Sequence, residues 1–297
     1  MTTVPARKER ARARLADAAY GAGWLAVRYL PEPVVRRGFA AAADASYRRG
    51  GAGVARLREN LGRVVGTDDP EHLETVVRAG MRSYARFWRE TFRLPAMDQA
   101  EIADRVAVKG TELLDGNRGR GIILALPHTG NWDAAAIWVI RYGLPFTTVA
   151  ERLAPESIFD RFVAYRESLG MEVLANTGGA EPPADVLKRR LRAGRTVALV
   201  SDRDLSRRGI PVTFFGAPTS MPAGPALLAA TTGAALLPVG CRFDGPDWAL
   251  HVHQEILLPP GGRLRDRIST ATQQLADVFA ADIAAYPSDW HMLQRMW

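Results

Sequence analysis

The sequence has very little cysteine: Cys241 is alone among 297 residues. One cysteine forms no disulfide within the chain and no cysteine-rich zinc site. This usage fits a reducing compartment. A chain of this length can bury a core large enough to fold without disulfide or metal staples.

Long apolar runs are also missing. The longest stretch without a charged residue covers 209–241, and five prolines interrupt it. A helix that crosses a bilayer needs about 20 predominantly apolar residues in one run, so this stretch predicts loop, helix and buried strand. The basic N-terminus has no apolar segment before a small-residue cleavage site, and we expect no signal peptide. The sequence favours a protein that lies on a membrane over one that crosses it.

Several functional motifs are absent. There is no Walker A loop and no G-x-S-x-G nucleophile elbow, which disfavours nucleotide hydrolysis and α/β-hydrolase chemistry. Residues 21–26 (GAGWLA) match a dinucleotide-binding string, but a basic helix precedes them where a strand is required. His251 and His253 share one face of a predicted strand, with Glu255 following. We expect an exposed strand face there and no metal site.

Positive charge is present in excess, mostly near the N-terminus. The net charge is +7 and the pI about 10.0. Residues 1–63 contain thirteen lysines and arginines against five acidic residues. This excess suits an anionic partner such as a membrane surface, a nucleic acid or an acidic substrate. A solvated surface in an arginine-rich protein is the alternative.

The first third of the chain predicts helices only. Apolar residues recur at spacings of three and four over 7–30, opposite the arginines, which indicates a basic amphipathic helix. Its apolar face suits either a lipid surface or packing on the rest of the protein. Further helices are expected at about 34–64, 70–94 and 98–104.

After residue 105 the pattern alternates between strands and helices. Apolar segments typical of strands occur at 106–109, 121–126, 146–150, 172–174, 196–201, 235–242 and 248–257. Helical segments separate most of them, and a long helix is expected at about 265–285. The predicted fold is α/β, with a mostly parallel central sheet flanked by helices and an N-terminal helical layer packed on it. We expect one domain over 1–297, with a helical layer at 1–104 and a catalytic core at 105–297.

One segment combines a buried strand with reactive side chains. Residues 121–133 read GIILALPHTGNWD, so His128 directly follows a strand. Ligands of open α/β sheets bind outside the carboxyl ends of the strands. Gly130 permits a tight turn, and Asn131 can cap a helix whose first turn contains Asp133. The spacing predicts that the Asp133 carboxylate reaches the His128 imidazole.

A His–Asp pair can activate a hydroxyl group. A neutral imidazole nitrogen accepts the hydroxyl proton during attack, while the carboxylate fixes the tautomer and stabilises the imidazolium. No protein serine or cysteine is then required. The H-x4-D spacing by itself is also compatible with a structural histidine; the strand, turn and helix around it favour catalysis.

These residues resemble the H-x4-D block of the lysophospholipid acyltransferase superfamily, especially its bacterial lipid A acyltransferase branch. Residues 201–204 (SDRD) with 211–216 (PVTFFG) resemble the third block of that branch, and 287–294 (PSDWHMLQ) its C-terminal block. Residues 81–94 (MRSYARFWRETFRL) and 150–153 (AERL) resemble the actinobacterial phosphatidylinositol mannoside acyltransferases most. The resemblance spans nearly the whole chain.

The resemblance implies an acyl-CoA donor, commonly palmitoyl-CoA, and a mannose hydroxyl of a phosphatidylinositol mannoside as acceptor. It implies a peripheral enzyme on the cytoplasmic face of the inner membrane, with no cofactor and no nucleic acid partner. His128 would be the general base and Asp133 its partner. Glu151 and Arg152 match the block that shapes the substrate pocket, Asp202, Arg203 and Asp204 match the third block, and Arg166 is a candidate for holding phosphate.

Three other functions remain open at this point. The same His–Asp pair would serve an acyltransferase for another glycolipid or a lysophospholipid. It would also serve a thioesterase, in which water replaces the sugar hydroxyl. A non-catalytic module that binds anionic lipid or nucleic acid through its basic helix would not need His128.

Overall fold

The structure is a computed structural model, and it describes residues 21, 23–152, 156–204 and 208–297. Most of the helix expected at 7–30 lies outside the described residues; within it, residues 23–29 are helical. In the part of the chain that is described, no helix is both long and apolar enough to cross a membrane.

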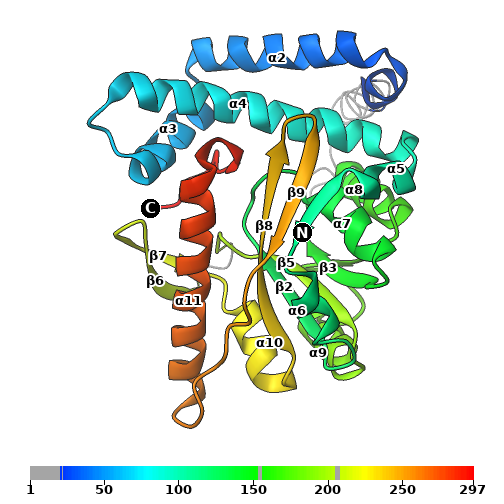
Figure 1. Cartoon of the computed structure of the whole chain (residues 1–297), viewed down its shortest axis with the longest axis vertical. Helices are drawn as coiled ribbons and strands as arrows, with labels where there is room; N and C mark the ends of the chain where they lie inside the picture. Colours follow the sequence, from blue (N-terminus) through cyan, green and yellow to red (C-terminus); the bar gives the residue numbers. More distant parts are fainter. Residues whose placement is uncertain (1–20, 22, 153–155, 205–207) are drawn as a thin grey trace, which may run out of the picture.

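The first third forms a layer of helices, as the sequence predicts. It consists of α2 (Glu32–Arg49), α3 (Ala52–Val65), α4 (Pro70–Arg93), the short η1 (Leu94–Ala96) and α5 (Gln99–Asp104). α2 and α4 lie side by side across one end of the molecule (Figure 1). The expected single helix at 34–64 is two helices, because Gly50 adopts a left-handed φ of 65° and ends α2.

The central sheet confirms the predicted α/β class. Its seven strands follow the order β1-β9-β8-β2-β5-β3-β4. They span β1 (Val106–Lys109), β2 (Ile122–Leu126), β3 (Phe146–Ala150), β4 (Glu172–Ala175), β5 (Thr196–Val200), β8 (Ala235–Asp244) and β9 (Asp247–Val252). All neighbours pair in parallel except β8 and β9, which form an antiparallel hairpin.

Helices cover both faces of this sheet. They are α6 (Thr111–Asp115), α7 (Trp132–Arg141), α8 (Glu156–Ser168), α9 (Pro183–Arg192), α10 (Gly224–Thr232) and α11 (Leu264–Ala285), with the short η2 (Pro287–Asp289) after α11. All five residues of β2 are buried. Ile123 and Ala125 pack in one apolar cluster, and Ile122, Leu124 and Leu126 in another on the opposite face. This explains the continuous apolar run at the start of the motif.

One element was not expected. Residues 210–221, in a stretch that predicts loop, form the hairpin β6 (Ile210–Phe214) and β7 (Ala217–Met221). The hairpin turns at Phe215 and Gly216, which both have positive φ, and it packs beside α11 (Figure 1). Prolines at 211 and 218 are tolerated because this ribbon has two strands only, so one edge of each is unpaired.

Candidate active site

The register of β2 and β5 brings two distant residues together. Leu126 pairs with Val200 at the end of both strands, and the Ser201 N–H donates to the Leu126 carbonyl at 2.8 Å. The residues two positions beyond the last pair are His128 and Asp202. Parallel strands end at the same edge of a sheet, so both side chains emerge at one place.

The turn after β2 is fixed from several sides. Gly130 has a φ of 55° and packs against the backbone of Cys241 and Arg242 on β8. Its N–H donates to the Asp289 carbonyl at 2.9 Å, and the His291 N–H donates to the His128 carbonyl at 2.8 Å. The C-terminal block therefore holds the motif turn in place through its backbone.

His128 is paired with Asp202. Its Nδ1 lies 2.5 Å from Asp202 Oδ1, and its backbone N–H donates to Oδ2 at 3.0 Å. The Trp290 indole N–H also donates to Oδ2 at 2.9 Å. Burial alone would raise the pKa of the Asp202 carboxyl, but attraction to His128 and these hydrogen bonds lower that pKa below its ordinary value. Asp202 is therefore a buried carboxylate, and it orients the His128 ring.

The Asp202 carboxylate on Nδ1 leaves Nε2 of His128 for another partner. The His128 side chain is 31% exposed, whereas Asp202 is fully buried. An imidazole whose Nδ1–H donates to a carboxylate has a free lone pair on Nε2. The exposed edge of His128 can therefore accept a proton from a bound hydroxyl group.

The prediction that Asp133 is the hydrogen-bond partner of His128 is wrong. Asp133 is buried and accepts from the Tyr165 hydroxyl and from Arg166 Nε, both at 3.2 Å. Asn131 caps α7 by accepting from the N–H groups of residues 133 and 134. Asp133 therefore belongs to the first turn of α7, and its carboxylate contacts α8 while Asp202 occupies the imidazole. Asp133 still lines the same cavity as His128.

This cavity has a volume of about 200 Å³ and mostly aromatic walls. The aromatic walls come from Tyr84, Phe87, Trp88, Trp132, Phe159 and Phe162. Its polar lining includes His128, Asp133, Glu151, Arg166, Arg203 and His291. An apolar pocket with a few convergent polar groups is the usual form of a small-molecule site, and these walls suit an acyl chain.

Three of the predicted substrate-binding residues reach the cavity. Glu151 and Arg203 both line it and form an ion pair at 3.5 Å. Arg166 lines it beside Asp133, with the guanidinium held at that carboxylate. A guanidinium partly neutralised by one carboxylate can still donate to a phosphate through its remaining N–H groups.

Two other predicted residues do not line the described cavity. Arg152 donates to Glu156 at 2.6 and 3.0 Å and to the Thr177 carbonyl. Asp204 accepts from the Gly209 N–H at 2.8 Å, where a Cβ on Gly209 would collide with it. Both contacts stabilise the chain close to the strand ends.

The C-terminal block forms a buried hydrogen-bond network with α4 that the sequence did not predict. Ser83 of α4 donates to Asp289 at 2.8 Å, and its Oγ lies 3.0 Å from His291 Nε2. Burial, followed by repulsion from His128, lowers the pKa of His291 to about 3. His291 is therefore neutral near pH 7, and its role is to hold the block against α4.

Glu90 links the motif turn to the helical layer. Its carboxylate accepts from Asn131 Nδ2 at 2.7 Å and from the Trp248 indole at 2.8 Å. It also accepts from Arg86 at 2.6 Å and from Arg89 at 3.2 Å. Four donors satisfy this buried carboxylate, so α4, β9 and the start of α7 are joined at one point.

The histidine pair noted in the sequence lies away from this cavity. His251, His253 and Asp282 have possible ligand atoms within 4.8 Å of one another. His253 Nε2 already contacts Asp282 at 2.7 Å, and Lys109 and Arg242 act on His251. Glu255, which follows the two histidines in the sequence, pairs with Arg120. Among the described residues, His253 is therefore hydrogen-bonded to Asp282, and two cations lie near His251.

Comparison with known proteins identifies the family. The family model described as bacterial lipid A biosynthesis acyltransferase matches residues 6–297. A protein of Mycolicibacterium smegmatis named phosphatidylinositol mannoside acyltransferase is 49% identical over 286 residues, covering 96% of this chain and 92% of its own. A protein of the same name from Mycobacterium tuberculosis is 49% identical, covering 95% and 88%. With a His–Asp pair beside an apolar cavity and this match along nearly its whole length, the chain belongs to the bacterial lipid A biosynthesis acyltransferase family and is an acyltransferase.

Proposed function

We propose that this protein transfers a fatty acyl group, with palmitoyl as the expected group, from acyl-CoA to a mannose hydroxyl of a phosphatidylinositol mannoside. The observation that carries the proposal is the buried Asp202 carboxylate on His128 Nδ1, which leaves Nε2 free at an aromatic cavity. The names of the relatives at 49% identity support the acceptor.

In this proposal His128 Nε2 accepts the proton of the sugar hydroxyl as its oxygen attacks the thioester carbonyl. Asp202 stabilises the imidazolium that forms. The tetrahedral intermediate then collapses, the C–S bond breaks, and the imidazolium returns the proton to the departing thiolate. The products are an ester and the free thiol of coenzyme A, and the enzyme returns to its initial state.

The lining of the cavity supports this choice of substrates. The six aromatic side chains offer an apolar wall for the acyl chain. Arg166 and Arg203 lie at the same cavity, and guanidinium groups suit the phosphates of either coenzyme A or phosphoinositol. Asp133 in this view is a positioning residue that holds Arg166.

A peripheral position on the cytoplasmic face of the inner membrane is part of the proposal. Large apolar side chains are exposed close together along the chain at the N-terminal end of the described residues: Leu25, Tyr29, Leu30 and Val34. Tyr29 is 74% exposed. Such a patch beside a basic chain segment suits insertion into the surface of an anionic bilayer.

The test measures coenzyme A release from palmitoyl-CoA, with and without purified phosphatidylinositol mannoside. We expect release that depends on the acceptor, an acylated lipid product, and a loss of at least a hundredfold in His128→Ala. His72→Ala, at an exposed histidine of α4, is the control and should keep full activity. Equal release without acceptor would support a thioesterase, and full activity of His128→Ala would remove His128 from the mechanism.

A further inference from the structure

A second and larger cavity lies on the other side of α4. Its volume is about 740 Å³, and it is enclosed by α2, α4 and the tip of the β8–β9 hairpin. On α4 it is lined by residues 82, 85, 86, 89, 90 and 93, whereas the catalytic cavity is lined by 84, 87, 88 and 91. The helical period places these two sets on different faces of α4.

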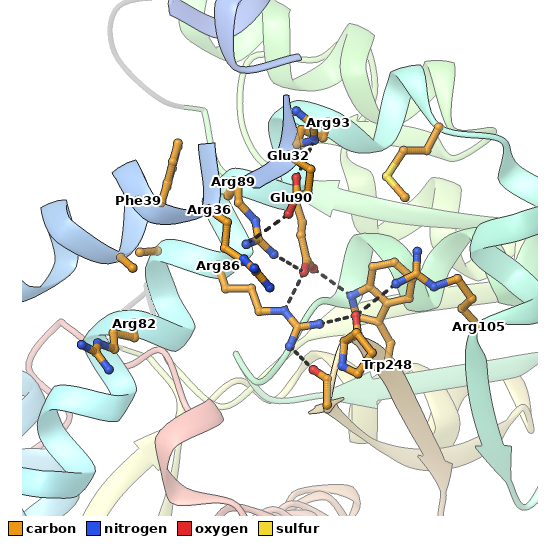
Figure 2. A pocket seen from close by; sticks show the side chains of 15 residues that line it. Glu32, Arg36, Phe39, Arg82, Arg86, Arg89, Glu90, Arg93, Arg105 and Trp248 are labelled. Atoms are coloured by element: carbon orange, nitrogen blue, oxygen red, sulfur yellow. Dashed lines mark hydrogen bonds and ion pairs between the residues drawn. The ribbon is translucent and has the colours of Figure 1, made fainter. Parts of the chain in front are cut away.

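The lining of this cavity is strongly cationic. Six arginines line it, and Figure 2 labels all of them: Arg36, Arg82, Arg86, Arg89, Arg93 and Arg105. Glu32 and Glu90 are the carboxylates of the lining. Outside it, Asp44 binds Arg82 and Asp247 binds Arg105. The six arginines therefore share four carboxylates among the described residues, which leaves an excess of two positive charges.

Two arginine side chains of the lining have N–H groups without an acceptor in the described part of the chain. Arg36 is exposed at the cavity, and its side chain has no hydrogen bond or ion pair within the described part of the chain. The Arg89 side chain is only 11% exposed; its terminal nitrogens pair with Glu32 and Glu90, but its buried Nε has no acceptor among the described residues. A buried N–H without an acceptor costs about 1–3 kcal/mol. An acceptor of negative charge would satisfy both groups.

Glu32 already occupies part of the place where such an acceptor would bind. Its carboxylate lies 3.3 Å from Arg89 and 3.0 Å from Arg93, and its side chain is 47% exposed. Arg89 and Arg93 are only 11% and 19% exposed, but the half-exposed carboxylate of Glu32 is screened by water, which weakens both pairs. Glu32 can therefore give way to a stronger anion.

We propose that this cavity binds a phosphate group through Arg36 and Arg89, in competition with Glu32. Arginine forks recognise phosphate oxygens through paired N–H donors. Phe39 and Trp248 provide apolar walls for the rest of the ligand. The chemistry is shared by a phospholipid headgroup and by coenzyme A; the headgroup is favoured by the exposed Leu30 and Val34 on either side of Glu32 in the chain.

A ligand in this cavity would also change hydrogen bonds that reach the turn carrying His128. Arg89 also donates to Glu90, and Glu90 accepts from Asn131, which caps α7 beside His128. A phosphate that draws Arg89 away would change the set of donors around Glu90. The proposed binding itself does not depend on the catalytic role of His128.

The test is a binding measurement on the full chain in a His128→Ala background, so that no turnover occurs. The probes are inorganic phosphate and coenzyme A by calorimetry, and phosphatidylcholine vesicles with and without phosphatidylinositol by co-sedimentation. We expect Arg36→Ala to weaken binding about tenfold and Glu32→Gln to strengthen it several-fold. Arg37→Ala, an exposed arginine of α2 outside the cavity lining, is the matched control.

The binding affinities of the variants, compared for each probe, test the proposal. If only the binding of phosphatidylinositol vesicles depends on Arg36, the site binds a lipid headgroup. If the binding of a soluble probe depends on Arg36, the site binds free phosphate or coenzyme A. Both outcomes support the phosphate site. Equal binding by the Arg36 and Arg37 variants for every probe, with no gain in Glu32→Gln, would overturn it. Opposite effects of Arg36→Ala and Glu32→Gln could not arise from general destabilisation.

Discussion

At the scale of residues, the proposed chemistry depends on which carboxylate meets His128. Asp202 contacts the ring, the backbone N–H of His128 and the Trp290 indole. Asp133 contacts Tyr165 and Arg166 instead. The two aspartates therefore affect different steps: Asp202 sets the state of the imidazole, and Asp133 sets the position of Arg166.

Asp202→Asn should lower kcat about 10³- to 10⁴-fold with the fold retained. Its carbonyl oxygen can still accept from Trp290 and from the backbone of His128. Its amide would then donate to Nδ1, which forces the imidazole proton onto Nε2 and removes the lone pair that accepts the hydroxyl proton. Steady-state kinetics and circular dichroism measure both properties.

Asp185→Asn, at an exposed carboxylate on α9, is the control and should behave as wild type. Activity within a factor of ten of wild type in Asp202→Asn would exclude this tautomer argument.

At the scale of elements, the catalytic turn is held by close backbone packing. Gly130 has a left-handed φ of 55°, and an added Cβ would lie 2.7 Å from the Arg242 backbone nitrogen on β8. Backbone atoms of a central strand cannot move aside. The glycine is therefore required by both conformation and space.

Gly130→Ala should lower the free energy of unfolding by roughly 3 kcal/mol and remove most activity. Gly50→Ala is the matched control, because Gly50 also has a positive φ of 65° but no atom within 4 Å of the added Cβ. That variant should cost only about 1 kcal/mol. Urea denaturation compares the two, and equal losses would mean that the contact with β8 does not matter.

The edge of the sheet provides a pH-dependent contact. Glu172 on β4 accepts from Arg190 of α9 at 2.5 and 2.9 Å and from Thr147 of β3. The hydrogen bonds from Arg190 lower the pKa of Glu172 from 4.5 to about 2. Because the folded value is the lower one, the contact stabilises the protein above pH 4.5, and this contribution is lost as the pH falls from 4.5 towards 2.

Glu172→Gln should therefore lower the free energy of unfolding by about 0.5–1 kcal/mol at pH 7, a small value because the side chain is 40% exposed. The difference from wild type should shrink as the pH approaches 2. Thermal unfolding between pH 7 and pH 2.5 measures it. Glu167→Gln, at an exposed glutamate without a described side-chain partner, is the control, and a constant difference at all pH values would contradict the prediction.

At the scale of the whole molecule, the two ends differ. The exposed apolar residues of 25–34 lie at the end formed by α2 and α4, and the segment between β9 and α11 reaches the opposite end (Figure 1). Both cavities adjoin α4. With the membrane at the α2 end, the lipid acceptor would approach the protein beside α4.

The double variant Leu25→Ser and Tyr29→Ser should weaken binding to anionic vesicles about tenfold or more, because two large apolar side chains no longer leave water. Leu257→Ser removes an apolar side chain that is 69% exposed in the segment between β9 and α11 and should have little effect. Vesicle co-sedimentation distinguishes the two. Equal effects would mean that the membrane does not contact this end.

The sequence by itself determined the elements and the motif. The buried run at 121–126, the turn at Gly130 and the cap at Asn131 depend on local chemistry and on the two-residue and 3.6-residue periods, which are visible in one segment. The same holds for the division into a helical layer and an α/β core. The break at Gly50 and the hairpin at 210–221 were missed, because glycines and prolines also occur in loops.

Only the tertiary structure decided which groups meet. Asp202 reaches His128 because β2 and β5 pair in register although 74 residues separate the two side chains. Both side chains stand two positions beyond the end of a strand, but the strand order that makes them neighbours is a long-range property. The same is true of Glu90 with Asn131, and of the six arginines that α2, α4 and the start of β1 bring to one cavity. Local periodicity fixes which face a residue occupies, and packing between distant segments fixes what that face touches.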